Sequence, residues 1–137
     1  MKQRITPEQL QELSDEQRQK LREWWEPEHG DWCVAVHKTR EIDPEAIFQF
    51  VGSTRKRVAN YKEFNFPLLD IGLMIEFLES FDQCLNISKR TDFFSNAWGY
   101  EIELRHLRLT VYKTGELVDA LWEAVKEVLN EECISIN

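Results

Sequence analysis

The chain has 137 residues, which is long enough for one hydrophobic core without disulfides to hold it together. Hydrophobic residues make up 42% of the sequence and aromatic residues 12%, which argues against an intrinsically disordered protein. The formal net charge of −8 argues against direct binding to nucleic acid, because generic binding to phosphates relies on clustered Lys and Arg.

The sequence contains no run of about 20 apolar residues, and its charged first residues are not followed by an apolar segment. We therefore expect neither a membrane span nor a secretory signal, and a cytoplasmic protein. The three cysteines have no short spacing, which is typical of free thiols in a reducing compartment. A paired-ligand spacing such as Cys-x-x-Cys is absent, and the sequence predicts no cofactor.

Two helix starts follow each other early in the chain. Thr6 and Ser14 are each followed three residues later by Gln, which is the spacing of a capping box. The sequence predicts helices over residues 7–13 and 15–25, either kinked at Ser14 or continuous.

The next stretch favours strands. Residues 32–37 alternate in polarity, which predicts a strand. Residues 45–51 are ambiguous between strand and helix, since Asp43 could cap a helix, but the apolar residues Ile47–Val51 suit a strand better. Residues 52–65 are polar and predict a loop.

The second half of the chain begins with an amphipathic helix. Asp70 is placed to cap it, and Ile71, Met74, Ile75 and Leu78 then share one face. Alternation predicts a short strand over 84–88 and longer ones over 98–104 and 107–111, with a tight turn or bulge between the last two.

The last long helix is predicted over residues 114–129. Its apolar stripe includes Leu121, Trp122 and Val125, while its acidic residues lie on the other side. The stripe needs an apolar surface, which the two preceding strands supply. We expect Trp122 to be buried there, facing Trp98.

These elements predict an α+β fold with a mainly antiparallel sheet covered by two amphipathic helices and an N-terminal helical arm. We expect a single domain over residues 1–137. Within it, residues 1–26 form the helical arm, 32–66 the strands and a basic loop, and 67–130 a helix-strand-strand-helix unit.

Ligand-binding patterns are weak. His29, Cys33 and His37 form the nearest approach to a metal-ligating or catalytic cluster, but their loose spacing is more typical of ordinary strand and surface positions. Glu101 and Glu103 share a strand face, as two-carboxylate chemistry requires, but a water-facing strand explains them better.

One basic cluster and one aromatic pair remain. Arg55, Lys56 and Arg57 could hold an anion, although the glycine pattern and following helix of a phosphate loop are absent. Trp24 and Trp25 end the helical arm and point in different directions, so one of them can stay exposed. An exposed indole there would be our first choice of partner contact.

The order of ITPEQLQELSDEQRQKLREWWEPEHGDW, FPLLDIGLMIEFLES and GELVDALWEAVKEVL resembles small uncharacterised proteins from phages and prophages of Gram-positive bacteria. The stretch 67–129 is also similar to the phage α-β-α sandwich domain. The resemblance implies a phage-derived accessory protein in the cytoplasm of a bacterial host. It carries no catalytic motif, so it assigns no functional residue.

The expected function is therefore a non-catalytic one through protein–protein interaction, with another protein or with a second copy of the chain in a homodimer. A specialised alternative is an acidic counter-defence inhibitor that imitates DNA or blocks a nuclease. A second alternative is a small-ligand or metal-binding enzyme that uses the His29–His37 region.

Overall fold

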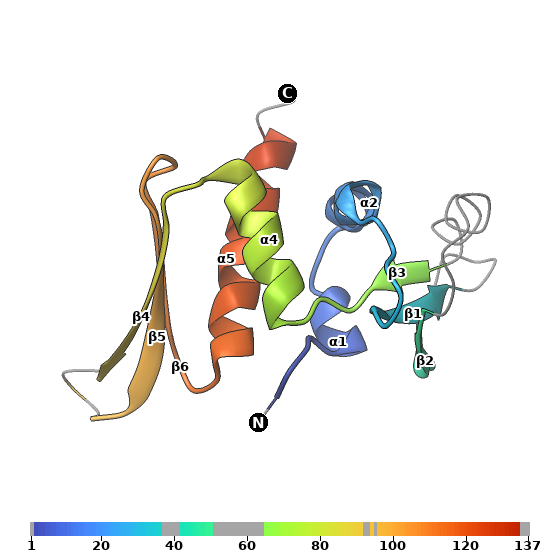
Figure 1. Ribbon diagram of the computed structural model, residues 1–137, viewed down its shortest axis with the longest axis horizontal. Helices are drawn as coiled ribbons and strands as arrows, with labels where there is room; N and C mark the ends of the chain where they lie inside the picture. The colour runs from blue at the N-terminus through green and yellow to red at the C-terminus, as the bar shows by residue number, and fades with distance from the viewer. Residues whose placement is uncertain (1, 37–41, 51–64, 92–93, 95, 135–137) are drawn as a thin grey trace. The chain divides into compact units, whose positions relative to one another are not determined.

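The computed structural model describes residues 2–36, 42–50, 65–91, 94 and 96–134. The chain divides into two units, one formed by residues 1–4 with 70–137 and the other by residues 5–69. Each unit contains a three-stranded antiparallel sheet and helices, which confirms the predicted α+β class (Figure 1). The single-domain expectation means that the two units unfold together, and it stays a prediction.

The 5–69 unit begins with two short helices, α1 (Pro7–Leu10) and α2 (Asp15–Trp24). Thr6 and Ser14 cap them, and each cap completes the predicted capping box with the Gln three residues later. The helices are separate, so the continuous alternative is wrong. Helix α1 also ends three residues earlier than predicted.

The sheet of this unit has the strand order β2-β1-β3. The central strand β1 (Trp32–Val36) pairs antiparallel with β2 (Ile42–Gln49) and with β3 (Asn65–Pro67). The preferred strand interpretation of the region around Ile47 is therefore confirmed for residues up to Gln49. The short strand β3 differs from the prediction, which places Asn65 in a loop and Pro67 at a helix start.

Helix α1 contacts β2, and helix α2 contacts β3. The guanidinium of Arg22 lies 4.5 Å from the ring centre of Phe66, which adds a cation–π contact between α2 and β3. Among the described residues of the unit, the buried apolar side chains are Ile5, Leu10, Leu13, Leu21, Trp25, Cys33, Val34, Ile42, Phe50, Phe66, Leu68 and Leu69.

The other unit contains α4 (Ile71–Phe81), β4 (Leu85–Thr91), β5 (Trp98–Leu104), β6 (Leu109–Thr114) and α5 (Leu117–Ile134). Asp70 caps α4 as predicted, and its carboxylate accepts the N–H of Leu73 at 2.8 Å. The three strands pair in chain order, β4 with β5 and β5 with β6. The short strand predicted over 84–88 is the longer strand β4 in the structure, so three strands lie between the two helices of this unit.

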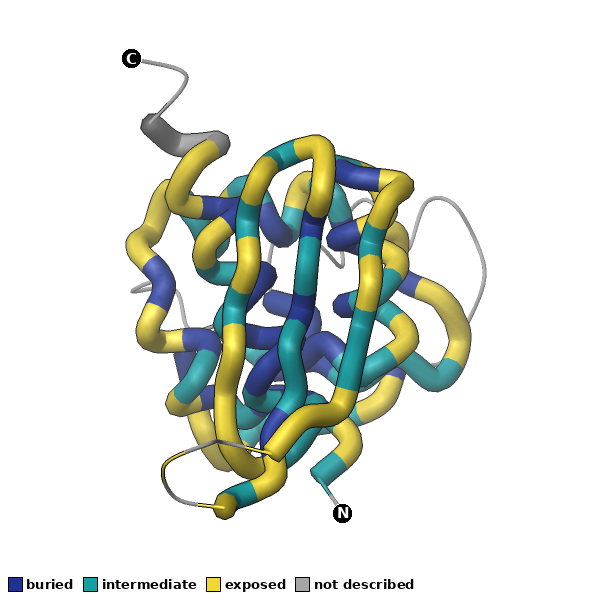
Figure 2. The backbone as a smooth tube through the Cα atoms, turned by 90° about the vertical axis from the view of Figure 1, so that its left-hand side faces the viewer, coloured by how far each residue is buried: buried dark blue, intermediate teal, exposed yellow. Residues whose placement is uncertain are grey.

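Helix α5 lies between the sheet and α4 and contacts both (Figure 1). It is buried along most of its length, through Val118, Ala120, Leu121, Trp122, Ala124, Val125, Val128 and Leu129. Figure 2 looks onto the sheet, in which the central strand β5 carries the buried positions Ile102 and Leu104 while the edge strands are half buried or exposed. The prediction that Trp122 is buried is confirmed, with 1% of it exposed.

Trp98 is an exception to the predicted packing. It shares a strand face with Ile102 and Leu104, but 61% of it is exposed, whereas those two residues are fully buried. The expectation that Trp98 faces Trp122 inside the core is therefore wrong. Alternation along a strand identifies the face, but it does not tell how far along the strand a covering helix extends.

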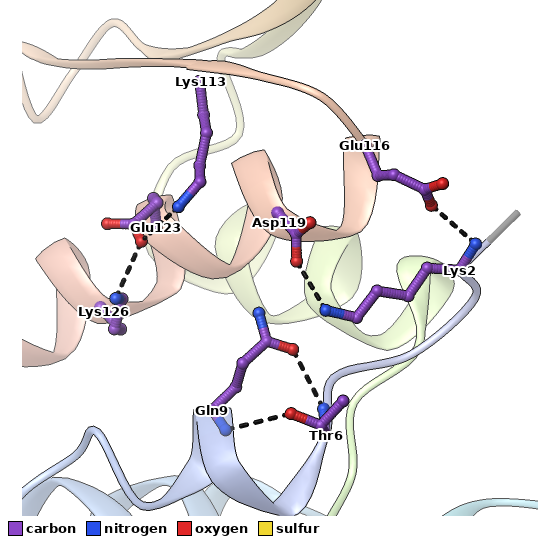
Figure 3. A network of polar contacts seen from close by, with 8 residues as sticks. All are labelled: Lys2, Thr6, Gln9, Lys113, Glu116, Asp119, Glu123 and Lys126. Atoms are coloured by element: carbon purple, nitrogen blue, oxygen red, sulfur yellow. Dashed lines mark hydrogen bonds and ion pairs between the residues drawn. The ribbon is translucent and has the colours of Figure 1, made fainter.

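Charged residues surround the start of α5 (Figure 3). The Lys2 N–H donates to Glu116 at 2.6 Å and the Lys2 ammonium lies 2.7 Å from Asp119, which ties residues 2–4 to this unit. Glu123 contacts Lys126 at 2.8 Å and Lys113 at 3.3 Å, so it joins α5 to β6. No helix in the described residues is both long enough and apolar enough to cross a membrane.

Candidate functional site

The residues of the predicted His29 cluster lie in different environments. Cys33 is fully buried in β1, and its thiol donates to the Phe48 carbonyl oxygen at 3.5 Å. His29 is exposed in the turn before that strand. His37 lies outside the described residues, as do Arg55–Arg57, so both predicted ligand groups stay predictions.

Trp25 is not available as a partner contact, and that part of the prediction is corrected. Its side chain is fully buried, and its indole Nε1 donates to Asp31 Oδ2 at 3.1 Å. Asp31 Oδ2 also accepts the N–H of Glu28 at 2.9 Å. This arrangement ties the end of α2 to the turn before β1. Trp24 is half buried, and its role as a contact stays a prediction.

The largest exposed apolar side chains of the described residues are on the β4-β5-β6 sheet and the loop before β5. Phe94 is 95% exposed, Trp98 61% and Tyr112 40%. Phe94 and Trp98 are only four residues apart in the chain. Exposed aromatic side chains of this size mark candidate contact surfaces, because their burial by a partner releases water from a large apolar area.

Trp98 is held firmly although it is exposed. It is the first residue of β5, it pairs with Thr91 of β4, and its carbonyl accepts the N–H of Gly115 at 3.1 Å. The Lys89 ammonium lies 5.3 Å from the centre of the Trp98 ring and 6.0 Å from that of Tyr100. We call Lys89 and Trp98 the Trp98 surface, which combines apolar area with a positive charge.

The opposite face of the same sheet is different. Arg90 pairs with Glu101 at 2.7 Å and Arg105 with Glu103 at 3.4 Å, which supports the water-facing explanation of the two glutamates. Tyr112 also lies on this face. Its hydroxyl is so close to Gly99 that a Cβ added there would be only 2.8 Å from it. The charged side chains of this face thus already pair with one another.

A second candidate site lies at the other end of the sheet. Asp82, Cys84 and His106 offer a carboxylate oxygen, a sulfur and a ring nitrogen that all lie within 4.8 Å of one another. Cys84 directly precedes β4, and His106 is in the turn between β5 and β6. The Cys84 sulfur is 2.9 Å from His106 Nε2, and both side chains are exposed.

Asp82 organises this second site. It follows the last residue of α4 and is only 3% exposed. Its Oδ1 accepts the N–H of Cys84 at 2.8 Å, and its Oδ2 accepts the N–H of Leu107 at 3.0 Å. Burial alone would raise the pKa of Asp82, but the backbone N–H groups of Cys84, Leu107 and His106, together with the His106 side chain, lower the pKa below its ordinary value.

Sequence reasoning missed the Asp82 site because its three residues come from separate segments. The register of β4 against β5, which the structure shows, brings two of these segments together. Leu85 pairs with Leu104, so Cys84 comes beside Arg105, whose N–H lies 3.5 Å from the Cys84 carbonyl oxygen. Alternation predicts a strand near Leu85 and a turn at His106, but it does not indicate that these two segments lie side by side.

Comparison with protein-family models, with curated proteins and with solved structures finds no match to this chain. The geometry of the Trp98 surface and of the Asp82 site is therefore the basis for the functional argument.

Proposed function

We propose that the protein acts by binding a protein partner through the Trp98 surface. The observation that carries the proposal is the 61% exposure of Trp98 at a position fixed by strand pairing. A rigid indole gives a large contact area and loses little conformational freedom when a partner covers it, which is why tryptophan is enriched among energetically dominant interface residues.

The charge of the surface indicates the chemistry of the partner. Lys89 is exposed and lies beside the Trp98 ring, so a segment that combines an acidic side chain with apolar ones is complementary to both. A nucleic acid is disfavoured by the net charge of −8. A two-fold dimer through this surface is disfavoured because both copies would present the same surface, which offers Lys89 no acidic partner.

This proposal keeps the non-catalytic accessory role that the resemblance to phage and prophage proteins implies. It moves the proposed contact from the end of α2 to the β4–β5 hairpin. The acidic inhibitor alternative is not favoured, because the side chains that make the Trp98 surface distinctive are aromatic and basic.

The test uses a displayed library of random peptides selected against the full chain. We expect enrichment of peptides that combine Asp or Glu with large apolar residues. Trp98→Ala and Lys89→Glu should each weaken binding of the selected peptides by about tenfold or more, which corresponds to about 1.4 kcal/mol. Tyr112→Ala is the matched control, since Tyr112 is an exposed aromatic residue on the other face of the same sheet.

Other outcomes would contradict the proposal. Peptides whose binding survives Trp98→Ala but is lost with Trp24→Ala would move the contact to α2. Binding of oligothymidylate that depends on Trp98 would make the surface a nucleic-acid platform instead. Concentration-dependent dimerisation, detected by sedimentation and abolished by Trp98→Ala, would assign the surface to self-association.

A further inference from the structure

We propose that Asp82, Cys84 and His106 form a binding site for a single zinc ion. The three side chains supply a carboxylate, a thiol and an imidazole, which are the donors that zinc takes in proteins. Sulfur together with nitrogen favours zinc over magnesium or calcium, because these harder cations prefer oxygen ligands alone. With three protein ligands, water would complete a tetrahedral coordination sphere.

The observed geometry is close to that of a bound state. Zinc lies about 2.3 Å from a thiolate sulfur and about 2.0 Å from an imidazole nitrogen, which at a tetrahedral angle places the two ligand atoms about 3.5 Å apart. The Cys84 sulfur and His106 Nε2 are 2.9 Å apart. Binding therefore requires these two exposed side chains to separate by about 0.6 Å, which side-chain rotation can provide.

Asp82 holds the two segments that carry the other ligands. Its carboxylate accepts one backbone N–H from Cys84 itself and another from Leu107, the neighbour of His106. Both ligand-bearing segments are thus fixed before an ion arrives, which reduces the ordering that binding requires. The backbone N–H groups of Cys84, Leu107 and His106 occupy three of the about four lone pairs of the carboxylate, which leaves one to coordinate the ion.

The zinc site would be independent of the Trp98 surface. The register pairs Leu85 with Leu104 at the end near Cys84 and Thr91 with Trp98 at the other end, so the two sites lie at opposite ends of β4 and β5. A bound ion would cross-link the end of α4, the start of β4 and the β5–β6 turn. Failure of peptide binding at Trp98 would leave this proposal intact, and the reverse also holds.

Calorimetric titration of the purified full chain with zinc chloride tests the proposal. We expect saturable binding of one zinc ion per chain, with release of the thiol proton of Cys84 to the buffer. Cys84→Ser and His106→Gln should each weaken the affinity by at least about tenfold. His29→Gln is the matched control, because His29 is also exposed but belongs to the other unit, and it should leave the affinity unchanged.

Two further measurements distinguish loss of a ligand from loss of folding. Cobalt(II) in place of zinc should give the near-ultraviolet charge-transfer band of a thiolate–cobalt bond, and Cys84→Ser should abolish the band while the circular dichroism spectrum stays unchanged. Zinc should also slow the alkylation of Cys84 by iodoacetamide, measured by peptide mass spectrometry.

Absence of saturable zinc binding would overturn the proposal. Binding that Cys84→Ser and His106→Gln leave intact would do the same. If His29→Gln weakened it instead, the site would belong to the His29–His37 region.

Discussion

The two sheets of the protein are assembled in different ways. In the β4-β5-β6 sheet every strand pairs with its neighbour in the chain. In the β2-β1-β3 sheet the central strand β1 pairs with β3, whose register joins Val34 to Phe66 across more than thirty residues. The first sheet follows from local patterns, whereas the second depends on a contact between distant segments, which costs more loop-closure entropy to form.

The units also differ in what buries their apolar residues. Within the part of the chain that the structure describes, one long helix, α5, supplies eight buried apolar side chains of its unit, whereas the other unit draws on short helices, strands and connecting segments. Substitutions in the two units can therefore show whether the protein behaves as one cooperative domain.

The largest expected effect is at Trp122. Trp122→Ala should lower the free energy of unfolding by about 3–5 kcal/mol, because it removes a side chain that is only 1% exposed and leaves a cavity in α5's packing. Urea denaturation followed by circular dichroism measures the change. Trp98→Ala is the matched control and should cost under about 1 kcal/mol. Equal losses for the two variants would contradict the burial difference between them.

The next effect compares the units directly. Leu21→Ala in α2 should cost about 2–4 kcal/mol, because Leu21 is fully buried. A unit of about 65 residues is marginally stable alone, so we expect both units to unfold in a single transition. The free energy of opening that hydrogen exchange reports for the α5 amides should fall by the same amount in this variant. Unchanged protection of α5 would show that the units unfold separately and would break the single-domain prediction.

A smaller effect is expected at the turn before β1. Asp31→Ala should cost about 1–2 kcal/mol, because it leaves the indole N–H of the buried Trp25 without its carboxylate partner. Adding Trp25→Phe removes that N–H, so the double variant should lose less than the sum of the two single variants. Simple additivity in thermal unfolding would show that this hydrogen bond contributes nothing.

The smallest effect concerns Glu123. Burial raises the pKa of Glu123, but its contacts with Lys126 and Lys113 lower the pKa more, to a value below the ordinary 4.5. The native state therefore gains stability above pH 4.5, and it loses this gain as the pH falls through the lowered pKa. Because the carboxylate is partly exposed, the contribution is under about 1 kcal/mol.

Glu123→Gln tests this dependence. The stability difference between wild type and the variant, measured by urea denaturation, should be present at pH 7 and shrink as the pH falls below 4.5 through the lowered pKa. A difference that is constant with pH would show that Glu123 acts through packing and not through its charge.

The sequence predicted those parts of the fold that depend on local signals. The caps at Thr6, Ser14 and Asp70 were correct because a cap is defined by residues within one turn of each other. Strand β5 was correct because polarity alternates along all of it. Strand β3 was missed because three residues that include a proline carry no alternation, and only pairing with β1 defines them.

The candidate sites were harder to predict for the same reason. The exposure of Trp98 depends on where along the sheet α5 provides cover, which its own sequence does not specify. The Asp82 site forms only when the end of α4, the start of β4 and the end of β5 lie next to one another, and its cysteine and histidine are 22 residues apart. Both sites are products of tertiary contacts.

The proposed function requires that a partner covers Trp98 while Trp122 stays in the core. Fluorine NMR of the full chain with all five tryptophans replaced by 5-fluorotryptophan tests it directly, after assignment by single substitution. We predict that the Trp98 signal shows a larger solvent isotope shift than the Trp122 signal, and that the selected acidic-apolar peptide moves the Trp98 signal most. A Trp98 signal insensitive to both solvent and peptide would contradict the account.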